Sequence, residues 1–258
     1  MEERRNPLIG VIGGVGPYAG LDFVRNIFNN TRALKDQEHL NTLLVSCPGI
    51  IPDRTKYLLD EEPVNPSGGL FESAKILHAA GARHAVVVCN TAHSDRIFMP
   101  FCGMVKEAMP DMVIVNMLRS CADFVKKNHP DIKVLGLLAT KGTYKSRVYH
   151  EYFRADEGFS ILEPEAPGQN RIGDAIYSLD FGIKAHSDPV QAKACNILFY
   201  EGFRLLDRGA QGLILGCTEL PLAVDPADFS APVFNPGLLA ARELIRLTAP
   251  SALTGESV

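Results

Sequence analysis

Two cysteines stand at matched places in the two halves of the sequence and could perform chemistry together. Cys89 lies eight residues after the glycine of Gly81-Ala82 (89 minus 81), and Cys217 lies eight residues after the glycine of Gly209-Ala210 (217 minus 209). A thiolate can remove a proton from one face of a carbon atom while a thiol delivers a proton to the opposite face. Most single cysteines are inert core residues, but this matched spacing favours a pair that inverts a stereocentre.

The beginnings of the two halves match as well. Residues 10–18 (GVIGGVGPY) align with residues 136–144 (GLLATKGTY) at an offset of 126 (136 minus 10), and both indicate a strand, a turn of small residues and a helix. The cysteines repeat at the nearly equal offset of 128 (217 minus 89). Such an internal repeat predicts two similar structural units that face each other and place their cysteines across one cleft.

Short apolar runs alternate with helical patterns along the chain, which indicates an α/β fold. The predicted strands are residues 8–12, 42–46, 84–89, 113–116, 134–138, 159–162, 212–216 and 232–234. Because the helical segments supply crossover connections, we expect mostly parallel sheets. We predict two pseudo-symmetric Rossmann-like lobes, each a sheet flanked by helices, with the active site in the cleft between them. One lobe comprises residues 1–117 plus 218–258 and carries Cys89, and the other comprises residues 118–217 and ends with Cys217.

The composition is that of an ordinary globular protein and argues against several classes of partner. The formal net charge is -4, and Lys and Arg form no run longer than a pair, so neither nucleic acid nor a membrane is expected as a partner. The apolar stretch at residues 8–12 is too short for a signal peptide or a membrane span. The six cysteines are therefore expected to be reduced thiols in the cytoplasm, and none has the Cys-x-x-Cys spacing of a zinc or redox site.

Four motifs of the chain resemble those of the aspartate/glutamate racemase family. Cys89-Asn90-Thr91-Ala92-His93 and Gly216-Cys217-Thr218-Glu219-Leu220 resemble its two signature motifs, and Gly13-Gly14-Val15-Gly16-Pro17 and Ile51-Pro52-Asp53-Arg54-Thr55 resemble two more. The likeness spans essentially the whole chain. It implies an isomerase that acts on a small amino-acid substrate, with aspartate or glutamate expected, without pyridoxal phosphate, metal or other cofactor. It also implies a homodimer.

The resemblance assigns roles to individual residues. Cys89 and Cys217 are the acid/base pair, and Arg54 binds a substrate carboxylate, for which a planar guanidinium is well suited. Lys184 resembles the lysine that the family assigns to the other carboxylate. The residues expected to donate hydrogen bonds to substrate oxygens are Asn90, Thr91, Thr140 and Thr218. His93 and Glu219 are predicted to tune the two thiols, although a helix cap and a favourable first-turn charge explain them equally well.

Other interpretations stay open at this point. Asn235-Pro236-Gly237 departs from the family pattern, so the substrate could be a related dicarboxylate, isomerised with one cysteine adding covalently as in a maleate isomerase. The chain could also bind an amino acid without turning it over. The pattern Gly14-x-Gly16-x-x-Ala19 fits a dinucleotide fingerprint, but the second predicted strand is not followed by the acidic residue that would hold a ribose, which argues against nicotinamide binding.

Overall fold

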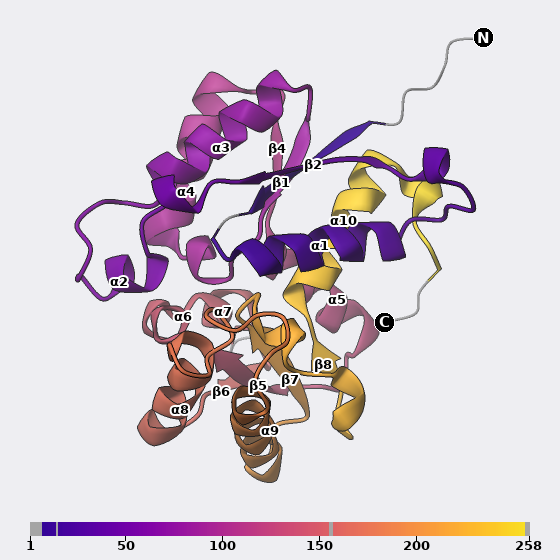
Figure 1. Cartoon of the computed structure of the whole chain (residues 1–258). Helices are drawn as coiled ribbons and strands as arrows, with labels where there is room; N and C mark the ends of the chain where they lie inside the picture. Colours follow the sequence, from indigo (N-terminus) through magenta and orange to yellow (C-terminus); the bar gives the residue numbers. More distant parts are fainter. Residues whose placement is uncertain (1–6, 14, 155–156, 256–258) are drawn as a thin grey trace.

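The computed structural model describes residues 7–13, 15–154 and 157–255, and it shows a parallel sheet in each half of the chain (Figure 1). The first sheet has the strand order β2-β1-β3-β4, with β1 at Leu8–Gly13, β2 at Asn41–Ser46, β3 at His84–Val87 and β4 at Val113–Val115. The second has the order β6-β5-β7-β8, with β5 at Val134–Ala139, β6 at Ser160–Leu162, β7 at Gly212–Gly216 and β8 at Val233–Phe234. The predicted strands and the predicted α/β fold with two sheets are confirmed.

Helices cover both sheets. They are α1 (Pro17–Asn29), α2 (Arg54–Leu58), α3 (Ser67–Ala79), α4 (Asp95–Ala108), α5 (Met117–Asn128), α6 (Lys141–Ser146), α7 (Val148–Tyr152), α8 (Ala166–Tyr177), α9 (Ala192–Asp207) and α10 (Pro236–Thr248). In Figure 1, α3 and α4 pack together on one side of the first sheet, and α1 packs against α10 on the other. No helix in the described part of the chain is long and apolar enough to cross a membrane.

Apolar side chains form three core layers. The first lies between the first sheet and helices α3 and α4 and contains Phe101, and the third lies between the second sheet and helices α8 and α9 and contains Leu198. The middle layer includes Val11 from the first sheet, Leu137 from the second and Leu244 from α10. Because this layer draws on both sheets, the two halves are packed against each other as one body, which holds the carboxyl ends of their strands in a fixed relation.

Helices α3 and α9 end in the same way, which supports the internal repeat. Gly81 and Gly209 both have a left-handed backbone, with φ values of 103° and 98°. In each case the amide of the following alanine donates to a leucine carbonyl in the last helical turn at 3.0 Å. Glycine adopts this conformation at little cost, so it ends the helix and directs the chain into the next strand. The matched glycines therefore deliver β3 and β7, and the cysteines beyond them, to equivalent positions.

Two strands end earlier than predicted because polar interactions turn the chain. The prediction for the third strand extended to Cys89, but β3 ends at Val87, whose carbonyl accepts the Cys89 amide at 3.0 Å in a tight turn. β4 ends at Val115 because Asn116 caps α5, with its side chain accepting the Arg119 amide at 2.9 Å. Both turns place side chains at the carboxyl edge of the first sheet rather than in its hydrogen-bond ladder.

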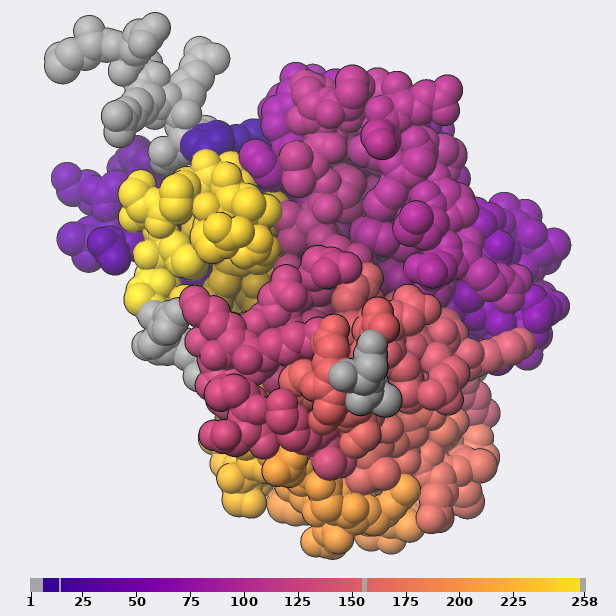
Figure 2. Space-filling model, turned by 180° about the vertical axis from the view of Figure 1, so that it is seen from behind, coloured from indigo at the N-terminus to yellow at the C-terminus, as the bar shows by residue number. Residues whose placement is uncertain are grey.

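The segment after Cys217 contributes to both halves. Its strand β8 pairs with β7 in the second sheet, whereas α10 packs against α1 and α5. Figure 2 shows the C-terminal segment, in yellow, lying beside parts of the first half and away from the orange residues at the other end of the molecule. The predicted division into residues 1–117 plus 218–258 and residues 118–217 did not anticipate this sharing of the tail, and it stays a prediction.

Candidate active site

Cys89 and Cys217 follow inner strands of the two sheets and line the same pocket. Cys217 directly follows β7, and Cys89 follows β3 after Val88. Both cysteines are nearly buried, with exposed fractions of 7% and 5%. The pocket is narrow, since the centre of a water molecule could occupy only about 10 Å³ of it. The structure thus brings two thiols from the matched halves to one enclosed place.

Most of the predicted site residues surround this pocket. Its lining includes Arg54, Cys89, Asn90, Thr91, Thr140, Lys184, Cys217, Thr218 and Glu219. His93 is not among the described lining residues and lies behind Cys89. Three residues that we did not predict, Val15, Thr55 and Tyr177, also line the pocket.

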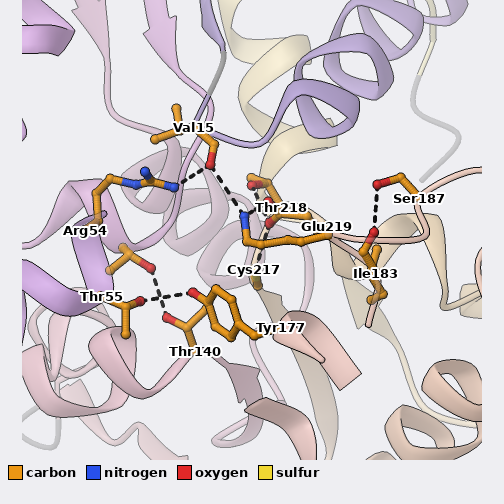
Figure 3. A network of polar contacts seen from close by, with 12 residues as sticks. Val15, Arg54, Thr55, Thr140, Tyr177, Ile183, Ser187, Cys217, Thr218 and Glu219 are labelled. Carbon is orange, nitrogen blue, oxygen red and sulfur yellow. Dashed lines mark hydrogen bonds and ion pairs between the residues drawn. The ribbon is translucent and has the colours of Figure 1, made fainter. Parts of the chain in front are cut away.

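Arg54 reaches into the pocket from the start of α2. Asp53 caps this short helix by accepting the Lys56 amide at 2.9 Å, which fixes where the helix begins and places Arg54 at its first position. The guanidinium donates to the Val15 carbonyl, as Figure 3 shows, and it also contacts the Cys89 thiol. Burial opposes the positive charge, but the nearby Cys89 and Asp53 more than offset burial and raise the pKa of Arg54. Arg54 is therefore a permanent cation beside one of the two thiols.

The surroundings of Cys217 are acidic rather than basic. Its thiol donates to Oε2 of Glu219 at 2.9 Å, and Oε1 of Glu219 forms an ion pair with Lys184. Burial, followed by the negative charge of Glu219, raises the pKa of Cys217 well above its ordinary value, although Lys184 opposes this shift. Burial also favours the neutral form of Glu219, but Lys184 and the thiol together lower its pKa. Cys217 is thus held as a thiol against a charged carboxylate.

Two buried donors in the pocket have no hydrogen-bond partner among the described residues. They are Nε of Arg54 and Nδ2 of Asn90. The Asn90 side chain is oriented by the buried Tyr149, whose hydroxyl donates to Oδ1 of Asn90, so the amide nitrogen is left on the other side. Unpaired buried donors are costly in a folded protein. Both are therefore suited to receive oxygen atoms of a ligand.

Threonine hydroxyls join the two halves at the edge of the pocket. Oγ1 of Thr91 lies 3.0 Å from Oγ1 of Thr140 and 3.0 Å from Oγ1 of Thr143. Thr140 also caps α6, accepting the Thr143 amide at 3.2 Å. Because each hydroxyl can donate one hydrogen and accept others, this cluster can redirect its hydrogens toward a ligand without moving its backbone.

His93 holds the Cys89 segment rather than facing the pocket. Its Nε2 lies 3.2 Å from the Met117 amide, which can only donate, so Nδ1 carries the hydrogen and donates to the Cys89 carbonyl at 2.8 Å. Complete burial lowers the pKa of His93 to about 4, despite the bond to Cys89. The ring is therefore neutral and links the turn after β3 to the start of α5.

A family model described as Asp/Glu/Hydantoin racemase matches residues 12–244. The chain belongs to this racemase family. A glutamate racemase of Methylococcus capsulatus is 31% identical over 260 residues, which cover 95% of this chain and 81% of that relative. A protein of Pectobacterium carotovorum is 33% identical over 97 residues, which cover 38% of this chain and 59% of that protein's length. Membership of this family makes the chain an enzyme of the isomerase class.

The solved structure of a racemase has the same fold. The aspartate racemase of Picrophilus torridus superposes with a TM-score of 0.75 at 24% sequence identity, and the match covers 94% of each chain. This likeness concerns the arrangement of the two sheets and their helices.

Three remaining predictions concern residues around the pocket of this racemase-family chain. Asn235 caps α10, with Oδ1 accepting the Gly237 amide at 2.9 Å, and it lines a small neighbouring hollow that shares Thr218 with the cysteine pocket. Gly14 of the dinucleotide pattern lies outside the described residues. Within the described ranges, no group of three or more His, Cys, Asp and Glu side chains is arranged to hold a metal ion.

Of the residues that we did not predict, two had a signal in the sequence. Val15 and Thr55 belong to the quoted glycine and Pro-Asp-Arg-Thr motifs, so their place beside the pocket follows from the motifs. Tyr177 is the last residue of α8 and belongs to no motif. Its position beside Thr55 depends on how α2 packs against α6 and α6 against α8, and no local pattern reports that packing.

Proposed function

We propose that this chain is a cofactor-independent amino-acid racemase, acting on aspartate or glutamate, in which Cys89 and Cys217 move a Cα proton. The observation that carries the proposal is the meeting of the two thiols in one buried pocket. A protein that only binds an amino acid has no need of two opposed thiols. A racemase needs one base and one acid on opposite faces of the substrate carbon.

The unequal charges around the two thiols support one cysteine acting as the base and the other as the acid. Cys217 is held as a thiol by Glu219 and can deliver a proton, while Arg54 gives a thiolate at Cys89 a direct ion-pair partner. Removal of the Cα proton by the Cys89 thiolate leaves an electron pair that delocalises into the substrate carboxylate. The Cys217 thiol then protonates the opposite face, and the two sulfur atoms end in exchanged protonation states. In the reverse direction the roles are exchanged.

Arg54 is the best-placed group to bind the substrate carboxylate. A Cα proton next to an ionised carboxylate is a very weak acid, so charge that develops on the carboxylate must be stabilised. Arg54 offers an unpaired buried Nε, and Asn90 offers an unpaired Nδ2. Lys184 is already paired with Glu219, and its Nζ lies 3.5 Å from the Val15 carbonyl. A second substrate carboxylate would have to compete with Glu219 for this ammonium.

The test is isotope exchange without added cofactor. The purified chain is incubated with L-aspartate or L-glutamate in heavy water, loss of the Cα proton is followed by NMR, and chirality is followed by chiral chromatography. We expect deuterium to enter Cα as the D enantiomer forms. No exchange on either substrate would contradict the proposal, and loss of maleate absorbance under the same conditions would favour the dicarboxylate isomerase instead.

The assembly of the chain is a separate part of the proposal. The homodimer comes from the family resemblance, and sedimentation velocity of the full chain tests it directly. A single species with the mass of one 28.1 kDa chain would contradict it.

A further inference from the structure

The cysteine pocket has a larger hollow directly beside it. This outer hollow is lined by Thr55, Lys141, Asn170, Gly173, Asp174 and Tyr177, and about 290 Å³ of it is open to the centre of a water molecule. The same measure for the cysteine pocket is about 10 Å³. Only Thr55 and Tyr177 are common to the described linings of both. These two side chains therefore form the wall between the two spaces.

The wall is closed by one hydrogen bond between the two halves of the molecule. Oη of Tyr177 lies 3.1 Å from Oγ1 of Thr55, and these residues are 122 positions apart in the sequence. Figure 3 shows the Tyr177 ring directed toward Thr55 across this gap. Thr55 itself is held in place by close packing of its backbone. Gly142 lies so near that a Cβ atom added to it would come within 2.9 Å of the Thr55 Cα. The tyrosine ring is therefore the part of the wall with freedom to move.

Tyr177 is also the most accessible part of the pocket lining. Its exposed fraction is 38%, the largest among the described lining residues, most of which are buried. The ammonium of Lys184 lies 5.7 Å from the centre of its ring. With so little space in the cysteine pocket, an amino acid can enter only when a wall moves. Rotation of this ring breaks one neutral hydrogen bond and leaves the buried walls in place.

The outer hollow carries charges of both signs. Lys141 lies at the start of α6, and its side chain reaches α8. Its Cε would lie 3.8 Å from a Cβ atom added at Gly173. Asp174 lines the same hollow from α8. An ammonium and a carboxylate in one hollow complement the two charged groups of an α-amino acid, and Asn170 adds a neutral amide.

We propose that the outer hollow is the first binding site for a free amino acid, and that Tyr177 is the gate through which the amino acid passes to the cysteines. The nature of the ligand rests on the proposed racemase function, but the gate does not. With the ring against Thr55 the thiols are shielded. With the ring turned away, the two spaces join and Lys141 leads an anionic group toward Arg54.

Thiol alkylation tests the gate without requiring turnover. The full chain is treated with iodoacetamide, and modification of each cysteine is followed by mass spectrometry. In Tyr177→Ala we expect the rate at Cys89 to rise at least tenfold relative to the half-buried Cys195 in the same molecule. Tyr177→Phe, which loses only the hydroxyl, should give a rise of two- to threefold. Tyr200→Ala removes an exposed tyrosine from α9 and is the matched control, with no change expected.

The outcomes separate the gate from the racemase proposal. The fully buried Cys121 must stay unmodified, which shows that each variant is folded. An unchanged ratio of Cys89 to Cys195 modification in folded Tyr177→Ala and Tyr177→Phe would overturn the gate. A raised ratio in a protein that exchanges no Cα proton would support the gate and contradict the racemase proposal.

A charged reagent tests the role of Lys141. Iodoacetate carries a carboxylate, whereas iodoacetamide has a similar shape and no charge. In Lys141→Glu we expect the rate of Cys89 modification by iodoacetate to fall at least fivefold relative to that by iodoacetamide. Lys193→Glu makes the same change of charge on α9, away from both spaces, and should leave the ratio unchanged. An equal ratio in Lys141→Glu and Lys193→Glu would show that the outer hollow does not receive anions on the way to the cysteines.

Discussion

The ends of β3 and β7 are alike in backbone and different in charge. Each strand follows a helix that ends at a left-handed glycine, and each delivers a cysteine to the common pocket. Beyond the cysteines the likeness stops. Cys89 contacts the guanidinium of Arg54, whereas Cys217 donates to the carboxylate of Glu219. The repeat thus places two sulfur atoms symmetrically and surrounds them with opposite charges.

This difference arises because the charged partners come from outside the repeated strands. At the offset of 128 that relates the cysteines (217 minus 89), Thr91 corresponds to Glu219 and His93 corresponds to Pro221. The first turn is anchored by a neutral histidine, and the second contains a carboxylate paired with Lys184. Sheet topology therefore accounts for where the thiols lie, and unmatched side chains account for the different charges beside them.

The largest effect should come from removing either thiol. If the two sulfur atoms act on opposite faces of one carbon, Cys89→Ala and Cys217→Ala should each lower racemisation in both directions by at least about 10³-fold, because neither half-reaction can be completed alone. Chiral chromatography of both enantiomers measures this. Cys195→Ala is the matched control and should keep full activity. Wild-type turnover in either active-site variant would mean that the two positions do not form an acid/base pair.

The strands and the cysteines could be predicted from the sequence because their signals are local. A short apolar run such as residues 212–216 indicates a buried strand by itself, and a Gly-Ala pair followed by a strand repeats in both halves. The contact between Thr55 and Tyr177 joins residues 122 positions apart, and it depends on the packing of α2 against the second half. No periodicity or motif contains that information.

The sequence also identified the candidate site residues, but it did not predict which of them contact one another. The family resemblance pointed to Arg54, Lys184 and Glu219, but the ion pair between Lys184 and Glu219 becomes visible only when β7 and the segment after α8 are placed together. The tail shows the same limit. Its strand β8 belongs to the second sheet and α10 packs on the first half, because a long chain can return to either surface that is left uncovered.

The next largest effect should fall on the Cys89 side. Arg54→Lys keeps the positive charge but loses the planar fork that can grip a carboxylate and contact the thiol together. We expect kcat/KM for aspartate or glutamate to fall by about 100-fold, in line with the loss of one well-placed group that stabilises developing charge. Arg246→Lys on α10, outside the described pocket lining, is the control. A change of less than threefold in Arg54→Lys would show that charge alone is sufficient there.

A pH dependence should distinguish the anchors of the two turns. The pKa of His93 is about 4 in the folded chain against 6.5 for the unperturbed group. The unfolded chain therefore takes up a proton first as the pH falls. The stabilisation is complete well above pH 6.5 and is lost progressively as the pH falls toward 4. The loss in the free energy of unfolding at pH 5 amounts to about 2 kcal/mol.

Urea unfolding at pH 7.5 and pH 5 measures this loss. His93→Gln should lower the free energy of unfolding at pH 7.5 and show a smaller further loss at pH 5 than the wild type. His186→Gln, a change in the second half, should keep the wild-type dependence. Parallel losses in the wild type and in His93→Gln would mean that other groups cause the acid sensitivity.

The smallest effect should appear on the Cys217 side, and it tests the comparison most directly. Burial and then Glu219 raise the pKa of Cys217, so Glu219→Gln should lower this pKa by removing the negative charge and freeing Lys184. The rate of Cys217 alkylation by iodoacetamide against pH measures the shift, with Cys195 in the same sample as the reference. Because a gate variant would change the rates at all pH values together, only a change in the midpoint reports on charge. If the midpoint stays in place, burial alone keeps Cys217 protonated, and the two strand ends differ less than their partners indicate.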